Sequence, residues 1–307
     1  QLTNIESAHL IGGVSDNIID TESVDWPVTI NGRAGDDTIR TGGGNDKILG
    51  GRGNDVISSG DGADNLRGQA GHDILEAGNG NDRLDGGSGN DQLAGGDGDD
   101  RLRGHTGNDL IDGGLGLDRL DELVGGNATL IDGQFVGAGL NSLVDIETAR
   151  IKAGQGDDVL DASGFSGPVT LIGGSGNDTL IGGPADDQLM GRQGRDRIEG
   201  RGGSDWLSGG GGDDSLLGHA GADSLIGGTG NDLLFGGDGN DTLLGRLGDD
   251  SLAGHGGDEA LLANSPSSSA AAGAGAGVDA LGAGVAASAL AAGADAGDGA
   301  AAAPSFT

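Results

Sequence analysis

A nine-residue pattern, G-G-x-G-x-D-x-U-x with U a large aliphatic residue, fills most of this chain. The pattern recurs ten times without a slip from Gly32 to Asp121 and ten more times from Gly173 to Leu262. The eighth position is Leu or Ile in every copy, and the sixth is Asp in every copy but the last, which has Glu259. An unbroken short period predicts a solenoid, in which each repeat contacts only its neighbours.

The pattern predicts an all-β solenoid of eighteen-residue coils. We expect G-G-x-G-x-D to form a turn and x-U-x to form a short strand, whose middle side chain points inward because side chains alternate along a strand. Two repeats then make one coil, with a strand on each side. Successive coils stack at about 4.8 Å, so the aliphatic side chains form two ladders in the core.

Stacking also brings the sixth-position carboxylates of successive coils together, as for Asp46 and Asp64. Such carboxylates repel unless a cation lies between them. Oxygen ligands on a flexible loop suit Ca²⁺ better than Mg²⁺. Four inter-coil sites on each edge of each array predict about sixteen calcium ions, a charge close to the −33 of the chain. The predicted carboxylate ligands are Asp37, Asp46, Asp55, Asp64, Asp73, Asp82, Asp91, Asp100, Asp109, Asp118, Asp178, Asp187, Asp196, Asp205, Asp214, Asp223, Asp232, Asp241 and Asp250.

These repeats resemble the RTX, or haemolysin-type calcium-binding, family. The resemblance implies a right-handed parallel β-roll, in which backbone carbonyls around positions two and four join the carboxylates as calcium ligands. Ala185 and Glu259 depart from the motif, so we expect the sites beside them to be weaker; Thr41, Ser59 and Ala77 replace the first glycine. The fourth-position glycines that the resemblance implies as carbonyl donors are Gly35, Gly44, Gly53, Gly62, Gly71, Gly80, Gly89, Gly98, Gly107, Gly176, Gly194, Gly203, Gly212, Gly221, Gly230, Gly239 and Gly248.

A second level of organisation is a tandem duplication with an offset of 141 residues. Asn4-Ile5-Glu6-Ser7-Ala8 resembles Asp145-Ile146-Glu147-Thr148-Ala149, and the two arrays have the same offset. The lead-in of the second unit contains a degenerate turn that ends at Asp158, a further candidate ligand. The predicted segments are an irregular β lead-in (1–31), the first array (32–121), a connector with the second lead-in (122–172), the second array (173–262) and a low-complexity tail (263–307). The connector is interpreted as irregular coils that continue the solenoid, with a flexible linker as the alternative.

The composition predicts that calcium drives folding. High net charge with few large apolar residues is typical of disordered chains, so we expect the metal-free chain to be largely unfolded. Extracellular calcium modules bind at about 10⁻⁴–10⁻³ M, so folding is expected outside the cell. The acidity argues against nucleic acid and anionic membranes as partners. No transmembrane run is visible. The family resemblance implies type I export from a bacterium, with the tail as a candidate secretion signal; a plain tail is the alternative.

The outer faces of the two arrays differ. Ninth positions of the first array alternate in charge, whereas those of the second are apolar. Contiguous outward apolar side chains are typical of an interface, which predicts a homo-oligomer or fibre; tolerated surface residues are the alternative. The predicted apolar stripe contains Leu217, Ile226, Phe235 and Leu244.

No catalytic motif is present, and the histidines are interpreted as solvent-facing loop substitutions. Two functions remain. We expect a non-enzymatic, secreted calcium-binding protein with a structural or adhesive role at the cell surface, in a matrix or in a fibre. The alternative is a calcium-folding export module of a larger secreted enzyme.

Overall fold

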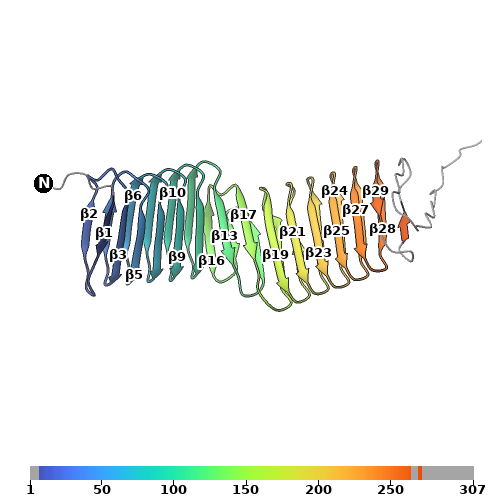
Figure 1. The fold of residues 1–307 in the computed structure, drawn as a ribbon, viewed down its shortest axis with the longest axis horizontal. Coiled ribbons are helices and arrows are strands. Elements are labelled where there is room, and N and C mark those ends of the chain that lie inside the picture. The colour runs from blue at the N-terminus through green and yellow to red at the C-terminus, as the bar shows by residue number, and fades with distance from the viewer. Residues whose placement is uncertain (1–6, 264–268, 272–307) are drawn as a thin grey trace, which may run out of the picture.

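The computed structural model describes residues 7–263 and 269–271. In this part of the chain every regular element is a β-strand, and the strands stack into one long solenoid (Figure 1). The strands form two sheets, called here sheet A, with fourteen strands, and sheet B, with sixteen. The predicted all-β parallel solenoid is therefore confirmed. No helix of the described part is long and apolar enough to cross a membrane.

Consecutive repeats alternate between the two sheets. The strands of sheet A, in the order of pairing, are β1 (Ala8–Ile11), β3 (Val28–Ala34), β5 (Lys47–Arg52), β7 (Asn65–Ala70), β9 (Arg83–Ser88), β11 (Arg101–Thr106), β13 (Arg119–Leu123), β17 (Thr148–Lys152), β19 (Val169–Ser175), β21 (Gln188–Gln193), β23 (Trp206–Gly211), β25 (Ser224–Thr229), β27 (Thr242–Leu247) and β29 (Ala260–Leu262). Those of sheet B are β2 (Ile18–Thr21), β4 (Thr38–Thr41), β6 (Val56–Asp61), β8 (Ile74–Asn79), β10 (Gln92–Asp97), β12 (Leu110–Leu115), β16 (Leu140–Val144), β15 (Gln134–Val136), β14 (Ala128–Ile131), β18 (Val159–Gly164), β20 (Thr179–Ile181), β22 (Arg197–Gly202), β24 (Ser215–Ala220), β26 (Leu233–Asp238), β28 (Ser251–Gly256) and β30 (Ser269–Ala271).

The core is the predicted double ladder of eighth-position side chains. Within the arrays the strands pair in parallel with an offset of eighteen residues, so Leu66 pairs with Leu84 and Leu84 with Leu102. These side chains are almost completely buried, and together they form one continuous apolar cluster along the stack. The core is thus one residue wide on each sheet, which explains why the eighth position accepts only Leu or Ile.

The strands are longer than the sequence predicts. Most array strands contain six residues, from the seventh position of one repeat to the third of the next, as in β5. The prediction of three-residue strands was therefore wrong. The physical reason is that coils in register also bring the first three positions of each repeat beside their counterparts, where their amides pair. Gly51, for example, has a φ of +125° yet still lies opposite Gln69 in the ladder.

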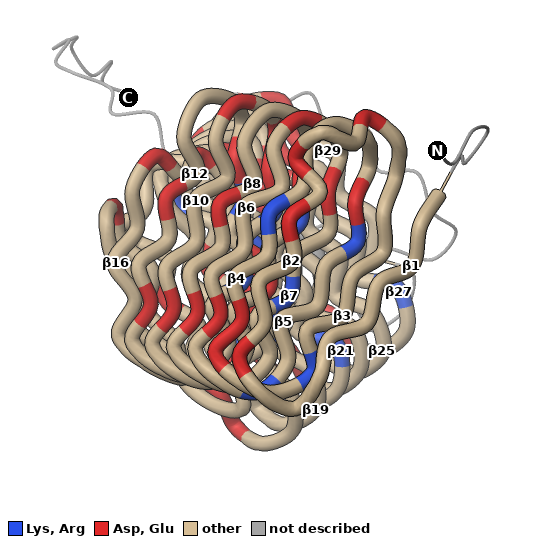
Figure 2. The backbone as a smooth tube through the Cα atoms, turned by 90° about the vertical axis from the view of Figure 1, so that its left-hand side faces the viewer, with Lys and Arg blue, Asp and Glu red and all other residues tan. Residues whose placement is uncertain are grey.

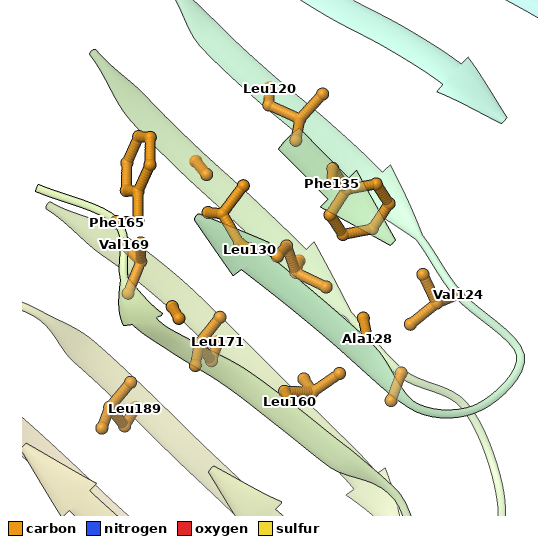
Figure 3. Packing of buried hydrophobic residues seen from close by; sticks show 14 of the residues in the cluster. Leu120, Val124, Ala128, Leu130, Phe135, Leu160, Phe165, Val169, Leu171 and Leu189 are labelled. Carbon is orange, nitrogen blue, oxygen red and sulfur yellow. The ribbon is translucent and has the colours of Figure 1, made fainter. Parts of the chain in front are cut away.

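The connector continues both sheets. In sheet A, β17 lies directly between β13 and β19, whereas in sheet B the short strands β14, β15 and β16 form an antiparallel meander between β12 and β18. Phe135 is buried among Leu120, Val124 and Leu130 (Figure 3), and its ring belongs to the continuous apolar cluster of the core. The connector is thus part of the same solenoid.

The predicted tail and secretion signal fall almost entirely outside the described residues. Ala263 and β30 are the parts of segment 263–307 that the structure describes, and β30 pairs with β28.

Candidate metal centres

The sixth-position aspartates form one column along each edge of the stack, and acidic columns of this kind run along the axis in Figure 2. Their side chains are buried, and each makes the same contact. Asp55 Oδ1 accepts the backbone amide of Asp37, one coil earlier, at 2.8 Å, and Asp196 Oδ1 accepts that of Asp178 at the same distance. One carboxylate oxygen of each residue therefore holds successive coils in register.

The other carboxylate oxygen has no partner in nearly all of these residues. Burying a carboxylate oxygen without a hydrogen bond is costly, and burial accordingly raises the pKa of Asp73 and of Asp82 to about 7. The buried Oδ2 atoms without a hydrogen-bond partner belong to Asp37, Asp46, Asp55, Asp64, Asp73, Asp82, Asp91, Asp100, Asp109, Asp118, Asp158, Asp178, Asp196, Asp205, Asp214, Asp223, Asp232 and Asp241.

The fourth-position glycines lie in the same turns. A Cβ added to Gly71 would lie 1.8 Å from the carbonyl oxygen of Gly53, so this carbonyl points toward the next coil. Gly71 also has a φ of +145°, which side chains disfavour. Among the described residues of the first array, the fourth-position carbonyls accept no backbone hydrogen bond. Each turn therefore offers an unpaired carboxylate oxygen and an unpaired carbonyl oxygen.

This donor set suits a hard cation. All of the unpaired atoms are oxygens, as Ca²⁺ prefers, and there is no sulfur or imidazole of the kind that Zn²⁺ selects. Within the described residues no group of three or more acidic or histidine side chains is placed to hold a metal. A cation bound between coils would therefore depend on backbone carbonyls as well as on carboxylates. The residues present fit calcium.

The family comparison agrees with this geometry. The model of the RTX calcium-binding nonapeptide repeat matches residues 29–57, 58–93, 85–120, 170–198, 190–225, 199–234 and 226–258. The chain belongs to the RTX calcium-binding repeat family. RTX repeats bind Ca²⁺ and are typical of secreted bacterial proteins. No curated protein was found to match the chain.

Three RTX turns differ from the rest. Asp187 Oδ2 accepts the backbone amide of Gly183 at 2.7 Å, in the loop that contains Pro184 and Ala185, so this oxygen is already paired. Glu259 Oε2 accepts the amide of Asp241 at 3.2 Å, while Oε1 is buried without a partner. Asp158 follows a degenerate turn yet has the same unpaired Oδ2 as the other aspartates. The Asp187 turn is therefore the one least in need of a cation.

At the end of the first RTX array, other residues replace the aspartates as acceptors of the backbone amides in both columns. Asn141 Oδ1 accepts the amide of Asp109 at 3.1 Å, and Glu147 Oε2 accepts that of Asp118 at 2.8 Å. Sequence reasoning missed both residues, because an insertion separates them from the aspartates by 32 and 29 positions instead of eighteen.

Sequence reasoning also missed an outer ladder at the fifth position. Asn54 Oδ1 accepts the amide of His72 at 2.7 Å, and His72 Nδ1 accepts that of Asn90 at 2.8 Å. His72 is exposed, as the sequence predicted, and it is also a link in this ladder, a role that the sequence did not indicate. The available signal was the prevalence of Asn and Asp at this position, because their side chains carry a short acceptor.

The predicted apolar stripe does not form a single surface. Leu217 pairs with Phe235 in sheet B, whereas Ile226 pairs with Leu244 in sheet A. Consecutive repeats alternate between the sheets, so residues nine positions apart face opposite sides of the solenoid. The prediction of one stripe was wrong, and the RTX array instead has two shorter apolar columns on opposite faces.

Proposed function

We propose that this chain is a secreted, non-enzymatic structural protein that folds on calcium outside the cell and acts as a stiff extracellular rod with an adhesive role. The observation that carries this proposal is the column of buried carboxylate oxygens without partners. A fold that buries so many like charges is unstable until cations neutralise them.

Calcium availability supports the extracellular site of action. Extracellular calcium modules bind at about 10⁻⁴–10⁻³ M, a concentration that the cytosol does not reach. The chain would leave the cell unfolded and become a rod where calcium is abundant. Each coil then contributes the same pair of strands and the same turns, so length and stiffness scale with the number of repeats.

Self-association through the apolar columns of the second array is part of the proposal. On sheet A, Trp206, Ile226 and Leu247 line a hollow of about 520 Å³. On sheet B, Leu217 and Phe235 line another of about 320 Å³. Because these hollows lie on opposite faces, a rod that used both would join neighbours on two sides, as a sheet or fibre requires.

A calcium titration tests the proposal, with circular dichroism and light scattering recorded on the same samples. We expect a cooperative gain of β signal near millimolar calcium, no response to magnesium, and growth in particle size after folding. A β signal already complete in chelator would refute calcium-driven folding. A folded particle that stays monomeric at all concentrations would refute self-association and leave a spacer or export module.

A further inference from the structure

Positive charge is concentrated on one face of this acidic protein. The chain has 16 Lys and Arg against 49 Asp and Glu, yet the outer side of sheet A from β5 to β17 is mainly basic. The acidic side chains that face outward there are Asp85 and Asp121. The basic residues on these strands are Lys47, Arg52, Arg67, Arg83, Arg101, Arg103, Arg119, Arg150 and Lys152. We call this surface the basic face.

A groove runs along the basic face, parallel to the axis of the solenoid. Its volume is about 680 Å³. One wall is the seventh-position column of sheet A, in which Arg83, Arg101 and Arg119 occupy successive coils. The other wall is the turn edge, which contributes Asn81, Asp99 and the sixth-position aspartates Asp64, Asp82 and Asp100, the candidate calcium ligands of that edge. The groove extends over five coils. It is therefore elongated, whereas a site for a small molecule would be enclosed.

The arginines of the groove lack enough carboxylates within the chain. Arg83 and Arg101 form no ion pair among the described residues, and both side chains are exposed. Arg103, Arg119 and Arg150 all approach the single carboxylate of Asp121, at 3.5, 3.2 and 3.4 Å. Guanidinium groups stacked one coil apart repel one another unless anions lie between them.

Calcium strengthens this positive field. Segment 32–121 contains nine Lys and Arg and eighteen Asp and Glu, and ten of these acids are the buried sixth-position aspartates. Cations bound at those aspartates leave the basic residues in slight excess over the remaining acids. The face that an anion meets is therefore more positive in the calcium-loaded protein than the composition of the chain suggests.

We propose that the basic face binds a linear acidic polysaccharide laid along the groove. The row of equivalent guanidinium groups repeats at the coil spacing of about 4.8 Å, which matches a polymer of similar anionic units better than a single ion. Arginine pairs well with carboxylates and sulfates because its planar fork donates two hydrogen bonds. Single-stranded nucleic acid fits less well, because the residues that line the groove include no aromatic side chain on which bases stack.

This inference deepens the adhesive role proposed above. It rests on the proposed function in one respect, which is that the chain folds when calcium binds. The test measures binding of two fluorescent probes, a short oligogalacturonate and a low-mass dextran sulfate, to the calcium-loaded full chain. Neutral dextran and an oligothymidylate serve as comparison ligands. Circular dichroism of the same samples reports folding separately, so a failure to fold is distinguished from a failure to bind.

The variant that tests the groove is Arg83→Gln with Arg101→Gln. Its matched control is Gln92→Glu with Leu110→Glu, which makes the same total change in charge at the seventh position on sheet B, the opposite face. We expect the groove variant to bind the anionic oligosaccharides about tenfold more weakly, with the salt dependence reduced, and the control to bind as the unmodified chain does.

Three outcomes would overturn the inference. They are no binding of either anionic probe by folded protein, equal weakening in both variants, and oligothymidylate binding as tight as that of the sugars. The first leaves the calcium-folding proposal intact, the second reduces the effect to net charge, and the third assigns the groove to nucleic acid. Of the two probes, the one that binds more tightly identifies carboxylate or sulfate as the preferred group.

Discussion

Asp100 and Asp82 lie one coil apart, and only one of the two carboxylate oxygens of Asp100 takes part in the contact between them. Asp100 Oδ1 accepts the backbone amide of Asp82 at 2.8 Å, and Asp100 Oδ2 is buried without a partner. The hydrogen bond places the coils in register, and the unpaired oxygen makes the same register costly without a cation. Fold and metal dependence therefore arise from one side chain.

Loss of one mid-array carboxylate should weaken calcium-driven folding. Asp82→Asn keeps a hydrogen-bond acceptor but removes an anionic ligand, so we expect the calcium midpoint to rise about two- to threefold. The control is Asp112→Asn, a ninth-position residue on β12 that lies outside the turns. A titration followed by circular dichroism measures both midpoints. Equal midpoints for the two variants would argue against Asp82 as a ligand.

The two neighbouring sites at Asp187 and Asp196 should differ in their response to substitution. Asp187 Oδ2 already accepts a hydrogen bond from Gly183, whereas Asp196 Oδ2 has no partner. We therefore expect Asp196→Asn to raise the calcium midpoint more than Asp187→Asn does. Isothermal titration should also find that Asp196→Asn loses more bound calcium. The reverse order would contradict the donor set deduced from the unpaired oxygens.

Acid should partly replace calcium in the metal-free chain. Burial raises the pKa of Asp73, Asp82, Asp205 and Asp214 to about 7 in the fold, against about 3.9 in an unfolded chain. The penalty for folding is therefore full above pH 7 and disappears as the pH falls toward 4. In chelator, β signal measured by circular dichroism should increase over that range. A signal that falls steadily with acidification would contradict this sign.

The narrow core should be sensitive to single cavities. Leu225 is fully buried on β25, so Leu225→Ala should lower the free energy of unfolding of the calcium-loaded protein by about 2–5 kcal/mol. Leu233 is 38 % exposed on β26, and Leu233→Ala serves as the control with a small effect. Denaturant unfolding at saturating calcium compares them. Similar losses would mean that the eighth position is not the core.

The two apolar columns allow each face to be tested separately for self-association. Phe235→Lys alters sheet B alone, and Leu244→Lys alters sheet A alone. If both faces join neighbours, either substitution should reduce particles to small oligomers, and the double variant should be monomeric in light scattering. Unchanged assembly in the double variant, with normal folding, would exclude these columns as interfaces.

The periodic parts of the molecule could be predicted, because each nine-residue repeat forms the same turn and the same strand. The aliphatic core and the two aspartate columns follow directly from the eighth and sixth positions. The prediction of one apolar stripe treated consecutive repeats as if they shared a face, and therefore merged Leu217 and Ile226. The predicted strands also ended too early, because pairing of the first three positions depends on neighbouring coils and not on local propensity.

The connector shows where sequence reasoning stops. Its β-rich runs indicate strands, but the meander of β14 to β16 and the burial of Phe135 depend on how much space the adjacent coils leave. Asn141 and Glu147 likewise continue the aspartate columns only because the insertion brings them there. Ala185 was the more informative departure, since Asp187 in the same turn is paired internally.

The connector also sets how the rod would respond to tension. Coils of the arrays are held at both edges by buried carboxylates that would bind cations, whereas the meander consists of short strands, the last of which carries the uncharged Asn141 in the place of an aspartate. A pull along the axis should open segment 122–172 first. Fully drawn out, these residues would span about 170 Å, at about 3.4 Å per residue, while both arrays remain intact. The connector would then extend under load and limit the force that reaches the two arrays.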